Sequence, residues 1–356
     1  MSAPFEMLLE APVYGLSQSQ KMPLLLARLR ELSLHHREHC GSYRQISDAA
    51  QACEQAQHYA ELLPLAVRLF KQRPLSSITQ EQLFKTLSSS GTSGARSQIF
   101  LDRAAAALQS KVLVKIMQHW LGKKRLPMLL VEQPALIANR QGFSARGAGA
   151  LGLSFLGRDH CYALDEQMQP NWPAIDAFCE RFAGEPVFIF GFTFMLWQCL
   201  LQPLAERGIL LPLKHAQIFH SGGWKKLQHL AVSPAQFNQC CEQHLGSAQV
   251  HNFYGMAEQT GTIFVSCEHG HLHAPMLADI LIRDPRTGQP LGIGEAGLIQ
   301  VFSGLPESYP GHSLLTEDLG IWLGEDDCPC GRRGRYFTVL GRETTAEVRG
   351  CSDTFS

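Results

Sequence analysis

Apolar residues recur at helical spacing along the first part of the chain. The segments QKMPLLLARLRELSLHHREHC and AELLPLAVRLF both place them three and four residues apart, which is the period of one helix face. Pro74 interrupts the pattern, because proline cannot continue a helix interior. The sequence therefore predicts a helical region over residues 13–72.

Beyond Pro74, short apolar runs alternate with longer amphipathic segments. Segments such as WPAIDAFCERFAG and SPAQFNQCCEQHLG repeat at helical spacing. Four apolar runs, each followed by a polar or glycine-rich turn, are predicted as strands: 126–132, 185–192, 216–223 and 248–255. Strand–helix alternation of this kind predicts an α/β fold with a parallel sheet covered by helices.

The pattern changes again past residue 261. The segment ADILIRDPRTGQPLGIGEAGLIQVF predicts two strands joined by a turn. Its GIGEAG portion (292–297) matches a dinucleotide-binding fingerprint, but that fingerprint needs a strand before it and a helix after it. Turn residues precede it and a β-like run follows, so a turn is predicted. The chain thus divides into a helical region (1–75), an α/β core (76–260) and a β-rich subdomain (261–340).

Composition and charge exclude several classes of function. The 356 residues carry a net charge of −1, which gives no electrostatic case for binding nucleic acid. The start of the chain lacks the pattern that predicts a signal peptide, and the most apolar stretch, VFIFGFTFMLWQCLLQPL, is interrupted by Gly191 and Gln198. That stretch predicts a buried strand followed by an amphipathic helix, not a membrane span. The 11 cysteines, an odd number in a chain with a large core, indicate reduced thiols and a cytoplasmic protein.

Unusual sequences follow two of the predicted strands, at the edge where parallel sheets bind ligands. HSGGW follows the run at 216–219, and NFYGMAEQTG follows the run at 248–250. A third segment, LSSSGTSGARSQIFLDR (87–103), offers hydroxyls and unhindered backbone N–H groups that suit a phosphate. Taken singly, each also fits a simple turn, and a lone glutamate is commonly a solvated one.

In this order, and with LTEDLG and LGR downstream, the segments resemble the adenylate-forming superfamily, whose members activate carboxylates with ATP. The resemblance runs from Ser88 to Arg342 and implies an adenylation domain over 1–340 with a short tail over 341–356. It implies ATP and Mg²⁺ as cofactors. It also implies these roles: a phosphate loop formed by Ser88, Ser89, Ser90, Gly91, Thr92, Ser93 and Gly94; adenine contacts by Gly222, Gly223 and Tyr254; a magnesium ligand in Glu258; and ribose contacts by Asp318 and Arg342.

Within the superfamily, the blocks SSGTSGARSQIFLD, HSGGWKK, NFYGMAEQTG and EVRGCSDTF are similar to those of LuxE acyl-protein synthetases. This resemblance implies that the chain adenylates a fatty acid and transfers the acyl group to Cys351 as a thioester. It further implies a LuxC-like acyl reductase as the partner that makes the fatty aldehyde. CPCGRRG and LGR also resemble phenylacetate–CoA ligases, so an acyl- or aryl-CoA ligase stays open, as does a non-catalytic nucleotide-binding subunit of a reductase complex.

Two departures from the superfamily pattern concern positive charge. Many members carry a lysine after the phosphate loop, where this chain has Arg96, Ser97 and Gln98. The candidates for phosphate contacts are Arg96, Lys225 and Lys226, although the two lysines also fit a solvated helix start. The lysine of the superfamily's mobile C-terminal domain has no counterpart before Ser356, which implies a lid reduced to the short tail.

A cysteine–histidine cluster is a further candidate site. CEHGHLH (267–273) and CPCG (328–331) offer three thiols and several imidazoles, a set that suits tetrahedral zinc. The spacing is not the common CxxC pair, so reduced thiols with exposed histidines are the alternative. The predicted ligands of a structural zinc are Cys267, His273, Cys328 and Cys330, with His269 and His271 competing for the histidine position.

Overall fold

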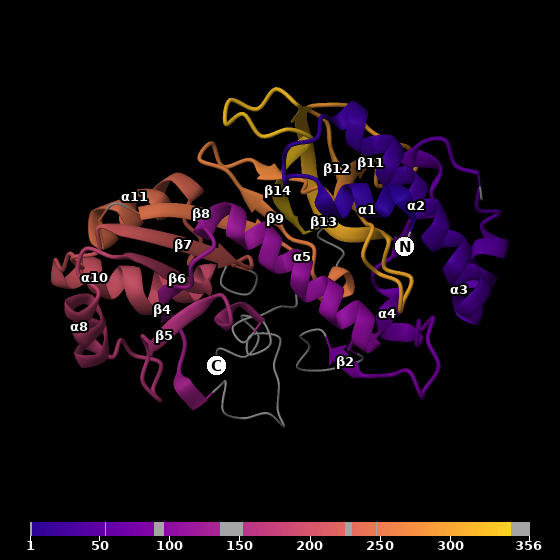
Figure 1. Cartoon of the computed structure of the whole chain (residues 1–356). Coiled ribbons are helices and arrows are strands. Elements are labelled where there is room, and N and C mark those ends of the chain that lie inside the picture. Colours follow the sequence, from indigo (N-terminus) through magenta and orange to yellow (C-terminus); the bar gives the residue numbers. More distant parts are fainter. Residues whose placement is uncertain are drawn as a thin grey trace. The chain divides into compact units, whose positions relative to one another are not determined.

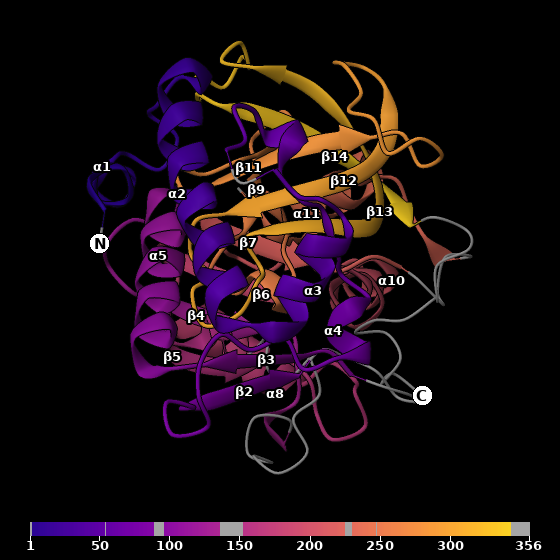
Figure 2. The same cartoon turned by 90° about the vertical axis from the view of Figure 1, so that its right-hand side faces the viewer.

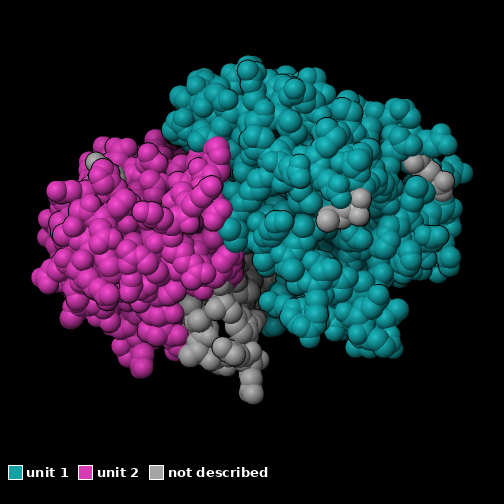
Figure 3. Space-filling model, in the orientation of Figure 1, with its two compact units in different colours: residues 1–89, 94–116, 254–346 teal, residues 90–93, 117–253, 347–356 magenta. Residues whose placement is uncertain are grey.

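Two units make up the structure, a computed structural model, and Figure 3 colours them differently. Unit 1 contains residues 1–89, 94–116 and 254–346, and unit 2 contains residues 90–93, 117–253 and 347–356. The structure describes residues 2–53, 55–88, 96–135, 152–224, 230–246 and 248–342. The predicted phosphate-loop residues from Ser89 to Gly94, together with Lys225, Lys226 and Cys351, lie outside the described residues.

A parallel sheet with the strand order β8–β7–β6–β4–β5 forms the centre of unit 2 (Figure 1). Its strands are β4 (Leu126–Leu130), β5 (Gly157–Tyr162), β6 (Pro186–Phe192), β7 (His215–Ser221) and β8 (Ala248–Tyr254). The helices α8 (Trp172–Arg181), α9 (Thr193–Leu196), α10 (Gln202–Arg207) and α11 (Pro234–Leu245) connect them. All four strands expected from the apolar runs are therefore present, and the predicted helix-covered parallel sheet is confirmed.

The most apolar stretch of the sequence lies in this unit. It forms β6, α9, one turn of π-helix (η2, Trp197–Leu201) and α10 in succession. Phe188, Phe190 and Phe194 are each at most 2% exposed, so its aromatic side chains belong to the core. No helix in the described ranges is both long enough and apolar enough to cross a membrane.

Unit 1 contains an antiparallel sheet with the order β11–β12–β13–β14–β10–β9. The strands are β9 (Phe264–Ser266), β10 (Leu272–His273), β11 (Ala278–Arg283), β12 (Ala296–Ser303), β13 (Ser313–Glu325) and β14 (Arg335–Arg342). β11 and β12 are the two strands predicted from the sequence. GIGEAG forms the turn that leads into β12, where the Glu295 carboxylate accepts a hydrogen bond from the Gly292 N–H, so the turn prediction is confirmed.

The N-terminal region of unit 1 is helical in part. It comprises α1 (Ala3–Glu10), α2 (Gln18–His39), α3 (Gly41–Ala49), a 3₁₀ turn η1 (Tyr59–Glu61), β1 (Leu65–Ala66) and α4 (Leu69–Gln72). The helix prediction is correct for α2 and α3 but wrong for much of residues 50–68. Pro64 has no N–H for a helix interior, and the next two residues pair in parallel with Leu314 and Leu315 of β13 instead.

α2 lies against the sheet of unit 1 (Figure 2), and buried polar side chains hold it there. The Gln18 side-chain amide donates to the Asp279 carboxylate at 2.7 Å, and the Lys21 ammonium lies 3.7 Å from the same group. Burial lowers the pKa of Lys21, although the Asp279 charge opposes this effect. Because each charge is buried beside its partner, the N-terminal helix is attached to β11 at a defined register.

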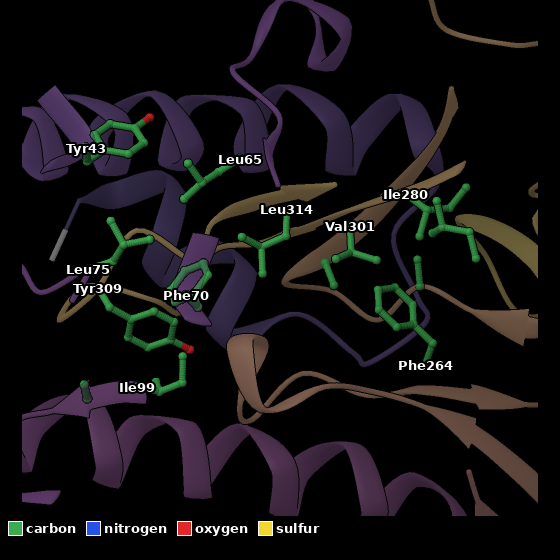
Figure 4. Close-up of a cluster of buried hydrophobic side chains, with 14 of the residues drawn as sticks. Tyr43, Leu65, Phe70, Leu75, Ile99, Phe264, Ile280, Val301, Tyr309 and Leu314 are labelled. Atoms are coloured by element: carbon green, nitrogen blue, oxygen red, sulfur yellow. The ribbon is translucent and has the colours of Figure 1, made fainter. Parts of the chain in front are cut away.

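β2 (Lys85–Ser88) and β3 (Gln98–Leu101) pair as antiparallel strands, and the segment predicted to bind phosphate lies between them in the sequence. Ser97, Ile99 and Leu101 are at most 2% exposed, whereas Gln98 is exposed, as strand alternation requires. Ile99 packs in the main hydrophobic cluster of unit 1, and Figure 4 shows it beside Tyr309. α5 (Arg103–Leu121) follows, capped by Asp102, whose carboxylate accepts from the Ala105 N–H at 2.7 Å.

Candidate active site

Three of the predicted ATP-binding residues are linked by side-chain contacts in unit 1. The Tyr254 hydroxyl donates to one carboxylate oxygen of Asp318 at 2.7 Å. The Arg342 Nε donates to the other oxygen at 3.3 Å. Burial raises the pKa of Tyr254 well above its usual value, and the Asp318 charge adds to this shift, so the hydroxyl stays a donor. The Asp318 carboxylate is therefore hydrogen-bonded to a tyrosine hydroxyl through one oxygen and to an arginine side chain through the other.

The register of two neighbouring strands produces this arrangement. Asp318 on β13 pairs directly with Arg342 on β14. Close to Asp318, the Thr316 hydroxyl donates to the Ile299 carbonyl and accepts from the Asp318 N–H, which ties this part of β13 to β12. The Tyr254 ring packs near Phe264 and Phe337, at centroid distances of 6.2 and 6.1 Å. An acceptor, a cationic donor and an aromatic ring thus lie together in unit 1.

Glu258 lies on a 3₁₀ turn (η4, Ala257–Gln259) and is buried, with 6% of its surface exposed. Burial raises the pKa of its carboxyl group, and the nearby Ser97 hydroxyl opposes that shift. The charges of Lys71 and Arg342 act in the same direction as the Ser97 hydroxyl. A carboxylate buried to this degree is suited to binding a cation, which would balance its charge.

The next residue along the turn fixes its position. The Gln259 amide nitrogen donates to the carbonyl oxygens of Val301 and Gly311, at 3.2 and 3.0 Å. Gln259 is itself 2% exposed, so both bonds are shielded from water. The turn that carries Glu258 is therefore attached to the end of β12 and to the loop before β13.

The predicted glycine pair lies at the carboxyl end of β7 in unit 2. Gly222 has a φ of 85°, in the region that L side chains rarely adopt, and a Cβ there would meet the Phe192 ring at 3.4 Å. Glycine is therefore required for the backbone path beyond β7. Among the predicted phosphate contacts, Arg96 is exposed, and Ser88 ends β2 opposite Gln98.

The predicted cysteine–histidine cluster is assembled in unit 1. The ligand atoms of Cys267, His273, Cys328 and Cys330 all lie within 4.8 Å of one another. Cys267 Sγ is 3.9 Å from Cys328 Sγ, and Cys330 Sγ is 3.3 Å from His273 Nε2. Bond lengths of tetrahedral zinc predict separations of about 3.8 Å between two sulfurs and about 3.5 Å between sulfur and nitrogen. The donor set and its spacing thus fit zinc.

The surroundings also suit a metal bound by thiolates. Burial lowers the pKa of His273 to about 3, which keeps its imidazole neutral. Burial alone would raise the pKa of Cys330, but hydrogen bonds from the backbone and side chain of Arg332 lower it. His271 Nδ1 lies 3.4 Å from Cys328 Sγ and its ring stacks on Tyr336, so His271 is placed to hydrogen-bond a ligand.

A family model decides where the chain belongs. The model described as "Acyl-protein synthetase, LuxE" matches residues 2–356. The chain belongs to the LuxE family of acyl-protein synthetases. LuxE family membership makes it an enzyme of the ligase class, as the sequence resemblance implies.

Two curated relatives are similar over most of the chain. The long-chain-fatty-acid–luciferin-component ligase of Vibrio harveyi is 22% identical over 332 residues, which are 90% of this chain and 84% of that protein. The enzyme of the same name from Aliivibrio fischeri is 22% identical over 339 residues, which are 91% of this chain and 85% of that protein.

The fold is similar to that of a solved adenylate-forming ligase. A 2-hydroxyisobutyryl-CoA ligase, crystallised in an open conformation with 2-HIB-AMP and CoA, matches with a TM-score of 0.68 and 18% identity. The match covers 94% of this chain and 78% of that one. The predicted adenylate-forming α/β fold of this LuxE family member is confirmed.

Sequence reasoning missed two residues that contact the site. Ser97 was noted only as one of the residues standing where the superfamily often has a lysine, yet it is fully buried and its hydroxyl influences the pKa of Glu258. Gln259, inside the YGMAEQ motif, was given no role, yet it holds the turn in place. The alternation of Ser97 with Ile99 and Leu101 was the signal that this serine faces inward.

Proposed function

We propose that the chain uses ATP to adenylate a fatty acid, transfers the acyl group to its own Cys351 and passes it to an acyl reductase. The linked set of Tyr254, Asp318 and Arg342 carries the proposal, because three residues of separate motifs meet at one carboxylate. Membership of an acyl-protein synthetase family supports it independently.

Each linked residue has a role that suits its chemistry. The Asp318 carboxylate accepts hydrogen bonds, which suits the two hydroxyls of ribose, and Arg342 donates to the same region. The Tyr254 ring and the glycine pair Gly222–Gly223 would contact adenine, since a flat base packs well on an aromatic ring or bare backbone. Residues Ser88–Gly94 would bind the phosphates, with Arg96, Lys225 and Lys226 as the candidate cations.

Glu258 is the proposed magnesium ligand. Its carboxylate oxygens are the ligand type that Mg²⁺ prefers, and its burial beside the neutral Ser97 leaves the charge to be balanced by a cation. When Mg²⁺ is bound, it neutralises negative charge on the phosphate oxygens. Glu258 would hold the bound cation in place while the pentacoordinate phosphorus forms.

The chemistry proceeds in two transfers. A carboxylate oxygen of the fatty acid attacks the α-phosphorus of ATP, and the bond to pyrophosphate breaks, which gives acyl-AMP. The Cys351 thiolate then attacks the acyl carbonyl, a C–S bond forms, and AMP leaves. The mixed anhydride makes the second step favourable, because AMP is a good leaving group.

Further parts of the proposal follow from the relatives and the sequence. The printed names of the curated relatives support a long-chain fatty acid as the substrate, and the family resemblance supports a LuxC-like reductase as the acceptor. Residues 1–340 would act as one adenylation domain, with 341–356 as the acyl-carrying tail. Reduced thiols support the cytoplasm as its compartment.

The test compares products with and without coenzyme A. Purified protein is incubated with ATP and labelled fatty acid and is then run on a denaturing gel. We expect label on the protein without CoA, which neutral hydroxylamine removes. Label that appears only as acyl-CoA, and only when CoA is supplied, would identify a CoA ligase and overturn the proposal.

We also propose that Cys267, His273, Cys328 and Cys330 hold a structural zinc. Cys267 follows β9 and His273 ends β10, whereas Cys328 and Cys330 lie in the β13–β14 connection. Bound zinc would cross-link two segments far apart in the sequence. Structural zinc contributes directly to folding free energy, because the site does not exist in the unfolded chain.

Purified protein is therefore expected to contain about one zinc per chain. Cys330→Ser is expected to lose the metal and to unfold at a lower temperature, since a hydroxyl is a poor zinc ligand. Elemental analysis and thermal unfolding measure both effects. Cys53→Ser is the control, because Cys53 is exposed and is not among the clustered ligands. Wild-type protein that is folded and zinc-free would return the cluster to ordinary thiols.

A further inference from the structure

The proposed zinc site and the proposed ribose contacts lie at opposite ends of one strand pair. Asp318 on β13 pairs with Arg342, the last residue of β14, and their side chains are hydrogen-bonded. At the other end, the connection between the two strands (326–334) carries Cys328 and Cys330. Because a slip of one residue moves every side chain to the other face of a sheet, a change of register would separate the Asp318 carboxylate from the Arg342 side chain.

The second half of β13, residues 319–325, specifies this register weakly. Register shifts occur between Leu319 and Gly320 and between Trp322 and Gly324. The two glycines are the buried residues of this half, and the others are half-buried or exposed. A strand fixes its register mainly through a buried face of apolar side chains, and glycine-rich strands without one are prone to slip. This part of β13 therefore contributes little to holding β14 in place.

The other edge of β14 is held by a very short strand. β10 pairs with β14 through two residues, Leu272 and His273. His273 is fully buried, and its Nε2 lies 3.3 Å from Cys330 Sγ. The same residue thus pairs with β14 and belongs to the proposed zinc site. A zinc ion bound there would fix β10 to the connection between β13 and β14.

Side-chain contacts at this end of the strand pair are weaker than a bound metal would be. Asp326 closes the base of the connection, since its carboxylate accepts from the Gly334 N–H at 2.7 Å. Arg332 forms an ion pair at 2.9 Å with Glu268, but the glutamate side chain is more than half exposed, and such pairs contribute little. Zinc held by three thiolates and an imidazole, most of them buried, would contribute far more.

We propose that the zinc site fixes the register of β13 and β14 and thereby keeps Asp318 and Arg342 aligned for the nucleotide. This inference rests on the proposed zinc site and on the proposed ribose contact of Asp318. With zinc bound, His273 holds β10 on β14, and Cys328 and Cys330 hold the connection, so Arg342 stays opposite Asp318. Without zinc, β14 can shift along the weakly specified part of β13, and the hydrogen bond between the two side chains is lost.

Removal of zinc should therefore weaken nucleotide binding and loosen one part of unit 1. Isothermal titration calorimetry with AMP compares zinc-loaded protein with protein from which a chelator has removed the metal. We expect the affinity for AMP to fall by about tenfold, the loss typical of one charge-assisted hydrogen bond, and to return when zinc is added back. Amide hydrogen exchange should become faster in β10 and β14, whereas β11 and β12 should be unchanged.

Three variants accompany this comparison. Cys330→Ser should reproduce the metal-free behaviour, and it replaces chelation if the metal cannot be removed from wild-type protein. Cys53→Ser, which removes an exposed cysteine outside the cluster, should bind AMP like wild type. Asp318→Asn should weaken AMP binding while its zinc content stays at the wild-type level, because the residue is not among the clustered ligands.

The outcomes separate this inference from the proposals on which it rests. It is overturned if wild-type protein binds zinc and Asp318→Asn weakens AMP binding, yet removal of zinc changes neither the affinity nor the exchange of β14. Metal-free protein that unfolds throughout would also overturn it, because the metal would then support the whole fold and not the register. Wild-type protein without zinc would reject the proposed zinc site, and unchanged AMP binding in Asp318→Asn would reject the proposed ribose contact; either result would reject the inference as well.

Discussion

Cys351→Ser is expected to form acyl-AMP at the wild-type rate but to carry no hydroxylamine-labile acyl group. The nucleotide-binding residues proposed above do not include the cysteine, so adenylation should not depend on it. A serine hydroxyl without an activating base is a far weaker nucleophile than the thiolate fraction of a cysteine. Labelled fatty acid with ATP, followed by a denaturing gel, should therefore show the label on wild-type protein alone.

Chain length permits this transfer. Cys351 is nine positions after Arg342 (351 − 342 = 9), and an extended segment of that length spans at most roughly 30 Å. Cys53→Ser, which removes an exposed cysteine of the N-terminal region, is the matched control and should keep the label. A hydroxylamine-labile label that persists in Cys351→Ser would place the acyl group on another cysteine and contradict the tail mechanism.

Glu258→Ala is expected to lower the rate of ATP–pyrophosphate exchange by about 10²–10³, the typical value of one preorganised electrostatic group. The carboxylate is the proposed ligand of the cation that neutralises charge on the phosphates, so the variant would lack that ligand. The exchange rate of Glu258→Gln should fall by a similar factor, because glutamine keeps the shape of the side chain but removes its charge.

Controls separate this effect from a loss of stability. Thermal unfolding of the glutamine variant should remain close to wild type, since burying an amide costs less than burying a charge. Glu206→Ala on α10 removes an exposed carboxylate of unit 2 and should leave exchange unchanged. Near wild-type exchange in Glu258→Ala would mean that this residue does not bind the metal.

Much of the fold follows from local pattern. Four of the five strands of the parallel sheet were predictable because each contains a short apolar run that ends at a glycine or polar turn, and burial on both faces selects such runs in β4 and β6. β5 was not predicted, because most of its residues are polar and exposed or half-buried. The linked residues of the candidate active site could be singled out one by one, because each lies in a short motif. Their assembly was implied by the family resemblance and not by spacing, since Asp318 and Arg342 meet through strand register.

Contacts between distant segments account for what the sequence did not predict. The segment around Leu65 has helical periodicity, but Pro64 and the available edge of β13 favour a strand there. Ser97 lies in no recognisable motif. Its importance comes from its nearness in the fold to Glu258, which is far away in the sequence. For the cysteine–histidine cluster, the residue types were evident, but the choice of His273 over His271 depends on which imidazole the folded strands bring among the thiols.

The most direct test of the account is ATP–pyrophosphate exchange by the wild-type protein. The protein is incubated with ATP, Mg²⁺, labelled pyrophosphate and fatty acids of increasing chain length, with CoA absent. Adenylation predicts label in ATP that depends on the fatty acid and needs no CoA. Exchange that stays at background with every chain length, in protein shown to be folded, would contradict the proposal that this chain activates fatty acids.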